Sequence, residues 1–150
     1  MDGLYVERRL LTGTTLSRDI AHHLYTRQLP GRVVIVGARP AVLLASVRKQ
    51  WAVVTRQVQR QRASTLNMRR AQELENALEH MRSAQFMTDE NSELPAPFGT
   101  RVVFMTQEAC IAQAPDCHTM YVTEPDDVAP IADMVAAMHP HSLVVLYELS

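Results

Sequence analysis

The sequence has few cysteines, no long apolar run and no glycine-rich phosphate-binding motif, and each absence excludes a class of protein. Its 2 cysteines, Cys110 and Cys117, fall in a chain of 150 residues, which is long enough to form a core without disulfides, so we expect reduced thiols. No apolar run approaches the roughly 20 residues of a membrane-spanning helix, and the start, MDGLYVERRLLTG, has no apolar segment of the signal-peptide kind. We therefore expect a cytoplasmic protein with no membrane partner.

Motifs that bind phosphates or metals through a fixed spacing are also missing. The chain contains neither G-x-G-x-x-G nor G-x-x-x-x-G-K-[ST], the glycine patterns of nicotinamide-binding and P-loop proteins. Its cysteines and histidines, including His139 and His141 on either side of a proline, match no standard zinc spacing. We therefore expect no metal.

Charge is segregated along the chain, although the net charge is only −1. Residues 1–82 carry 14 Lys and Arg against 6 Asp and Glu, which gives +8, whereas residues 83–150 carry 1 against 10, which gives −9. Within the first part, a basic block of seven residues falls in 23 positions with no acid between them: Arg48, Lys49, Arg56, Arg60, Arg62, Arg69 and Arg70.

Two interpretations of this basic block stay open. It can be a solvated helix face that the acidic half balances, within the molecule or across a homodimer, or it can attract phosphates and nucleic acid. Because Trp51 is the single aromatic residue in the block, we do not expect recognition of nucleic acid by base stacking. Loose contact with phosphates stays open.

The organising segment of the fold is residues 32–56, RVVIVGARPAVLLASVRKQWAVVTR. The four consecutive β-branched residues at 33–36 predict a central parallel strand that is buried on both faces. Gly37 permits a sharp turn, and Pro40 suits the first position of a helix. The apolar run from Trp51 to Thr55 predicts a second strand, so that the whole segment forms one βαβ unit.

Helical and strand patterns alternate along the rest of the chain. We expect helices from 14 to just before 30, from 66 to 81, from 109 to 112 and from 128 to 138, strands at 84–88, 101–106, 118–123 and 142–149, and a loop at 89–99. Residues 1–13 are expected to form an N-terminal arm or edge strand. The alternation predicts a single domain, 1–150, with a three-layer α/β/α fold around a mainly parallel sheet of about five or six strands.

This order of elements resembles that of class I S-adenosylmethionine-dependent methyltransferases, which are Rossmann-like. The resemblance lies in the helix that leads into VVIVGA, the turn and helix that follow, and the late stretch MHPHSLVVLYE, in which a proline turn precedes an apolar strand. Only Gly37 matches the family's first-turn glycines, and Thr55 and Arg56 stand where the family has an acid that binds ribose. The resemblance therefore implies a minimal or degenerate relative, whose S-adenosylmethionine would bind at this turn.

Rossmann-like sheets bind ligands at the carboxyl ends of their strands, and the candidate residues are those expected there. Arg39 and Arg56 would hold a phosphate or carboxylate, although both can equally be solvated loop residues. Glu124 is a candidate general base, but helix capping explains the same stretch. The candidate cofactor-binding residues are Gly37, Ala38, Arg39, Thr55, Arg56 and Asp89, and further predicted strand ends are Thr88, Thr106 and Thr123.

These patterns predict a small domain that binds S-adenosylmethionine or another nucleotide-like molecule at the turn after the first core strand. As an enzyme, it would be a transferase of the methyltransferase type. The alternative function is a non-catalytic scaffold or regulatory module that forms a homodimer or docks a partner through its oppositely charged halves.

Overall fold

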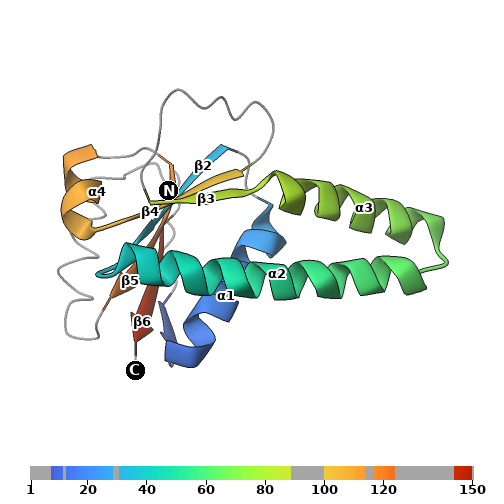
Figure 1. The fold of residues 1–150 in the computed structure, drawn as a ribbon, viewed down its shortest axis with the longest axis horizontal. Helices are drawn as coiled ribbons and strands as arrows, with labels where there is room; N and C mark the ends of the chain where they lie inside the picture. Colours follow the sequence, from blue (N-terminus) through green and yellow to red (C-terminus); the bar gives the residue numbers. More distant parts are fainter. Residues whose placement is uncertain are drawn as a thin grey trace.

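Six parallel strands form the central sheet of the computed structural model, which describes residues 8–11, 13–28, 31–88, 100–113, 117–123 and 144–149 (Figure 1). Their order across the sheet is β1-β6-β5-β2-β4-β3, and each neighbouring pair is parallel. The strands are β1 (Arg8–Leu11), β2 (Gly31–Val36), β3 (Gln85–Met87), β4 (Thr100–Met105), β5 (His118–Thr123) and β6 (Val144–Leu149). The described helices are α1 (Gly13–Arg27), α2 (Pro40–Ser64), α3 (Met68–Ser83) and α4 (Gln107–Gln113).

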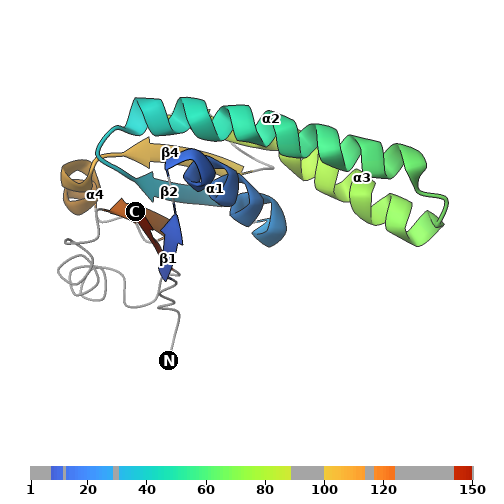
Figure 2. The same ribbon diagram turned by 90° about the horizontal axis from the view of Figure 1, so that it is seen from below.

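β2 lies in the middle of the sheet because its β-branched run has no polar face. Val33, Val34, Ile35 and Val36 are at most 3% exposed. Val33 and Ile35 pack with residues of α1, α2 and α3, whereas Val34 and Val36 pack with Cys110 of α4 in a second core. Figure 2 shows α2 lying along the sheet over β2 and β4. The predicted Rossmann-like α/β/α fold around a parallel sheet is confirmed.

The predicted strand at 51–55 is wrong, because these residues continue α2. The buried residues of α2 recur at the spacing of a helix face: Val47, Trp51, Val54 and Val58. The Trp51 indole Nε1 donates a hydrogen bond to the Met81 carbonyl of α3 at 3.2 Å. This packing outweighs the β propensity of the sequence WAVVT, which depends on context. Residues 32–56 are therefore one strand followed by part of one long helix.

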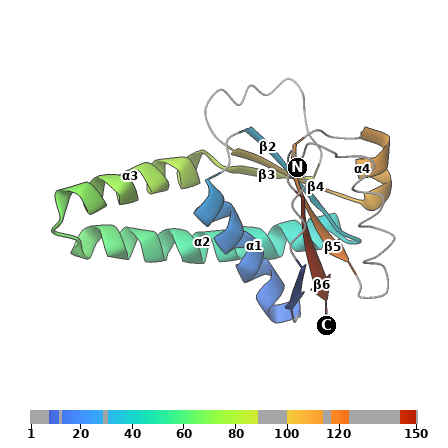
Figure 3. The ribbon, with the colours of Figure 1, turned by 180° about the vertical axis from the view of Figure 1, so that it is seen from behind.

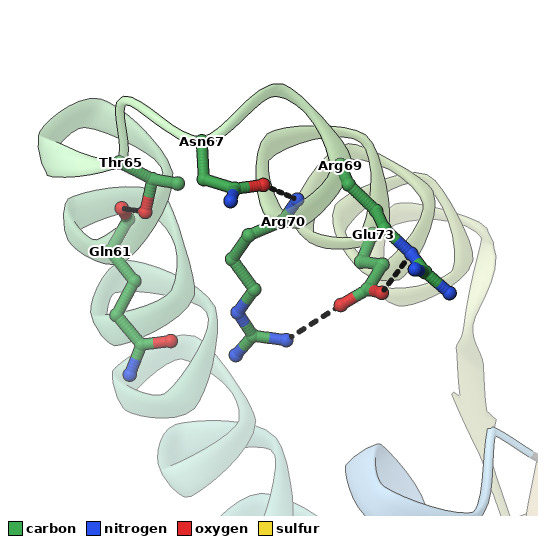
Figure 4. Close-up of polar contacts among 6 residues, drawn as sticks. All are labelled: Gln61, Thr65, Asn67, Arg69, Arg70 and Glu73. Carbon is green, nitrogen blue, oxygen red and sulfur yellow. Dashed lines mark hydrogen bonds and ion pairs between the residues drawn. The ribbon is translucent and has the colours of Figure 1, made fainter.

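α2 and α3 form an antiparallel helical hairpin, here called the arm, which extends well beyond the sheet (Figure 3). α2 has 25 residues and α3 has 16. Leu74 and Leu78 of α3 belong to the same core cluster as Val58 of α2, so apolar packing holds the two helices together. At the tip, the Asn67 side chain caps α3 by accepting a hydrogen bond from the Arg70 N–H at 3.0 Å (Figure 4).

The other predicted elements within the described residues are confirmed, with small shifts at their ends. The predicted helices that begin near 14, 66 and 109 are α1, α3 and α4, and the four later predicted strands are β3, β4, β5 and β6. Residues 1–13 are predicted to form an N-terminal extension or edge strand, and β1, which lies in this segment, pairs with β6 at one edge of the sheet. The predicted loop at 89–99 and the predicted helix at 128–138 lie outside the described residues.

Candidate functional site

The connections that leave two neighbouring strands, β2 and β4, turn to opposite faces of the sheet. Val36 at the end of β2 pairs with Met105 at the end of β4. The chain leaving β2 enters α2, which packs on one face, and the chain leaving β4 enters α4, which packs on the other. In open α/β sheets, ligands bind outside the carboxyl ends of the strands at such a switch point. The turns at residues 37–39 and 106–107 therefore form the candidate site.

Gly37 allows close packing at this turn because it has no side chain. Its N–H donates a hydrogen bond to the Met105 carbonyl at 3.0 Å, which ties the two turns together. A Cβ atom at Gly37 would lie 3.3 Å from the Leu43 Cδ2 and 3.8 Å from the Val122 Cβ. The absence of a side chain thus lets Leu43 pack closely, and the groups of the turn that remain open to a ligand are those of Ala38 and Arg39, both exposed.

α2 begins without the side-chain oxygen that commonly caps a helix. Arg39 is its N-cap residue, Pro40 is its first residue, and no acid lies in its first turn. Pro40 has no N–H, and the N–H groups of Ala41 and Val42 have no acceptor within the helix. The Arg39 guanidinium and the positive end of the α2 dipole therefore lie at the same turn, which makes this turn electropositive.

Thr106 supplies the β4 side of the site. Its Oγ1 accepts a hydrogen bond from the Ala109 N–H at 3.2 Å, which caps α4. The side chain is exposed, and the hydroxyl hydrogen is still able to donate. The sequence places Thr106 at a strand end, but that this strand lies next to β2 becomes known only from the strand order. The site therefore combines hydrogen-bond donors with positive charge, which suits an anion.

The structure does not bring Thr55 and Arg56 to this site, contrary to the prediction. Both lie inside α2, 15 and 16 positions beyond Pro40, which at 1.5 Å per residue is about 23 Å along the helix axis. The Thr55 hydroxyl donates to the Trp51 carbonyl within the same helix at 2.8 Å. The prediction failed because it placed both residues after a second strand. Asp89 and Glu124 lie outside the described residues.

A buried histidine pair lies away from this edge, where β5 begins. The Nε2 atoms of His23 in α1 and His118 in β5 are 3.2 Å apart, and the ring centroids are 5.3 Å apart. Burial, reinforced by the charges of His23 and Arg27, lowers the pKa of His118 to about 4. Within the described structure, the His118 Nδ1 is buried without a hydrogen-bond partner. The sequence carries no signal for this pair, because 95 positions separate its members.

The two cysteines are thiols, and Cys110 is not an activated nucleophile. Its Sγ lies 3.1 Å from the Tyr121 hydroxyl in a buried position, and burial raises the pKa of the Cys110 thiol. In the described ranges, no group of three or more His, Cys, Asp and Glu residues is arranged to hold a metal ion. No described helix combines the length and apolar character needed to cross a membrane.

Comparison with known proteins found no matching family model, no matching curated protein and no matching solved structure. The methyltransferase resemblance therefore stays a prediction.

Proposed function

We propose that this protein binds a nucleotide-like small molecule, through its phosphate or carboxylate group, at the turn between β2 and α2. S-adenosylmethionine is one such molecule, since it carries a carboxylate on a nucleoside. The ligand's anionic group would meet Arg39 and the first N–H groups of α2, with Thr106 beside it on the β4 turn.

The observation that carries this proposal is the unusual start of α2. Among the helices whose N-cap contacts are described, α3 and α4 begin with Asn67 and Thr106, whose oxygens accept backbone hydrogen bonds. α2 begins with Arg39, whose side chain has no acceptor. A positive charge at the positive end of a helix costs about 0.3–1 kcal/mol. A bound anion would reverse that repulsion by pairing with the guanidinium and accepting from the N–H groups of Ala41 and Val42, which have no acceptor within the helix.

The proposal is for binding, and it assigns no catalytic residue. Within the described residues, the second half of a methyltransferase-like site, which binds the ribose after the second strand, has no counterpart next to β2, because α2 and α3 follow β2 and the next strand, β3, lies beyond β4. The resemblance to methyltransferases therefore supports only the turn itself, and a panel of ligands is needed to separate S-adenosylmethionine from other nucleotides.

Calorimetric titration tests the proposal with two matched arginine variants. S-adenosylmethionine, S-adenosylhomocysteine, NADP and ATP are titrated into the wild-type protein, Arg39→Ala and Arg56→Ala. Both arginines are exposed, but only Arg39 lies at the site. Loss of a charge-assisted hydrogen bond should weaken binding by about 10- to 100-fold in Arg39→Ala, and Arg56→Ala should bind as the wild type does. Binding of none of the four, or equal weakening by both variants, would contradict the proposal.

The alternative function, a scaffold that pairs with a second copy through oppositely charged halves, is favoured by one observation. Five arginines of the basic block, between positions 56 and 70, belong to the arm, and this hairpin projects beyond the sheet (Figure 1). Light scattering after size-exclusion chromatography should then give a dimer mass at low salt and a monomer mass at high salt. A monomer mass at every salt concentration would exclude this alternative.

A further inference from the structure

Three basic residues of the arm form a stripe along the outer face of α2. They are Lys49, Arg56 and Arg60. Seven and eleven positions correspond to about two and about three helical turns, so the three side chains leave the helix on nearly the same side. The buried residues of α2 leave it on the opposite side, because they lie at offsets of about half a turn: Val47, Trp51, Val54 and Val58. All three stripe residues are accordingly exposed.

The stripe differs in its electrostatic partners from three of the other four residues of the basic block, and the fourth, Arg48, donates a hydrogen bond to the Phe86 carbonyl at 3.0 Å. Arg62 forms an ion pair with Glu75 at 2.8 Å. Arg69 and Arg70 both lie near Glu73, at 3.9 and 3.2 Å (Figure 4). These three arginines are therefore at least partly neutralised by α3.

Among the described residues, the three stripe residues have no acidic partner. Within the part of the chain that the structure describes, Lys49, Arg56 and Arg60 make no hydrogen bond or ion pair. No Asp or Glu occurs from 40 to 72, so the whole of α2 lacks an acid. Three like charges thus face solvent on a straight helix that belongs to a projecting hairpin (Figure 3). A linear array of unpaired cations of this kind suits a linear polyanion.

The spacing and the residues between the charges indicate which polyanion fits. The rise along α2 is about 10 Å from Lys49 to Arg56 and about 6 Å from Arg56 to Arg60, a span of about five base pairs of duplex DNA at 3.4 Å per step. The positions between them on this face hold Ala52 and Val53, with Gln57 beside the stripe. Between Lys49 and Arg60 this face has no aromatic residue for base stacking, and its largest apolar side chain, Val53, is only partly exposed, which does not suit insertion into a lipid surface.

We propose that this stripe contacts the phosphate backbone of a duplex nucleic acid without reading its sequence. The contact would be separate from the ligand site, since Arg39 takes no part in it. Binding would be electrostatic and would depend steeply on salt, because each phosphate neutralised by the stripe releases bound counterions.

Fluorescence anisotropy with a labelled DNA duplex over a range of salt concentrations tests this inference. For three phosphate contacts, the slope of log K against log salt should be about −2.7. Arg56→Ala and Arg60→Ala should each make that slope shallower by about one unit. Arg69→Ala is the matched control, since it removes an arginine of the same arm that already has an acidic neighbour, and it should leave the slope nearly unchanged.

Three results would overturn the inference. They are absence of binding at low salt, an equal effect of Arg69→Ala, and binding to anionic phospholipid vesicles with no binding to the duplex. All the substituted arginines are exposed, so the variants should keep the melting temperature and the circular dichroism spectrum of the wild type. Arg39→Ala should bind the duplex normally, which separates this contact from the proposed ligand site.

Discussion

Lowering the pH from 7 to 5 should destabilise the protein most strongly through a buried histidine, His118, and burial also lowers the pKa of His80. The pKa of His118 is lowered from the ordinary value of 6.5 to about 4, chiefly because burial disfavours the charged ring, and secondarily because of His23 and Arg27. Between about pH 6.5 and pH 4, the His118 imidazole binds a proton in the unfolded chain but stays neutral in the folded protein. The free energy of unfolding therefore falls as the pH drops from about 6.5 to about 4, and this contribution is constant below that.

The size of the effect follows from the difference between the two pKa values. Each unit corresponds to about 1.4 kcal/mol, so the difference between 6.5 and about 4 gives a limit of about 3 kcal/mol. At pH 5 the accumulated loss is about 2 kcal/mol. That is a large part of the stability of a domain whose total is typically about 5–15 kcal/mol.

Urea denaturation at pH 7 and pH 5 measures this loss in the wild type, His118→Gln and His22→Gln. Between the two pH values, His118→Gln should lose about 2 kcal/mol less than the wild type, because it has no imidazole to protonate at this position. Carboxylates also titrate in this range, but they do so in all three proteins and cancel in the comparison. His22→Gln, a change at an exposed neighbour on α1, should behave as the wild type does. An equal loss in His118→Gln and the wild type would show that His118 does not stay neutral in the folded protein over this pH range.

Three further predictions concern the packing that holds the arm and the site. Trp51→Phe should lower the free energy of unfolding by about 1–2 kcal/mol in urea titrations, since it leaves the Met81 carbonyl without its buried donor; no loss would show that the indole bond is not formed. Gly37→Ala should change stability by less than about 1 kcal/mol, because a slight displacement of Leu43 is offset by a stiffer unfolded chain, and a loss of several kcal/mol would contradict the packing described. Asn67→Ala should cost about 1 kcal/mol through the lost α3 cap, as measured by thermal denaturation, whereas an unchanged melting temperature would mean that the cap does not contribute.

The centre of the sheet could be predicted from the sequence because its signal is local. Four β-branched residues at 33–36 have no polar face, and burial on both sides of a parallel sheet is the arrangement that satisfies them. Pro40 likewise marks the start of α2 correctly, since a proline suits the first helical position. Each of these patterns stays within one element and needs no knowledge of its neighbours.

The arm could not be predicted because residues 51–55 suit either a strand or a helix. Trp51 and the two valines after it have high β propensity, and their place in a helix is decided by contacts with α3 and the sheet. Because of that single error, the prediction placed Thr55 and Arg56, two of the six candidate cofactor-binding residues, at the end of a strand, whereas both lie inside a helix. The His23 and His118 pair and the position of Thr106 beside β2 depend on strand order, which no local pattern contains.

Amide chemical-shift mapping by NMR shows directly whether the turn between β2 and α2 binds a ligand, with S-adenosylmethionine and ATP each titrated into the labelled protein. We expect the largest shifts at the amides of Ala38, Arg39, Ala41 and Val42, together with those of Thr106 and Gln107 on the neighbouring β4 turn. The amides of Thr55 and Arg56 should not move. Shifts centred on the arm, or no shift with either ligand, would contradict the claim that the turn between β2 and α2 is a binding site.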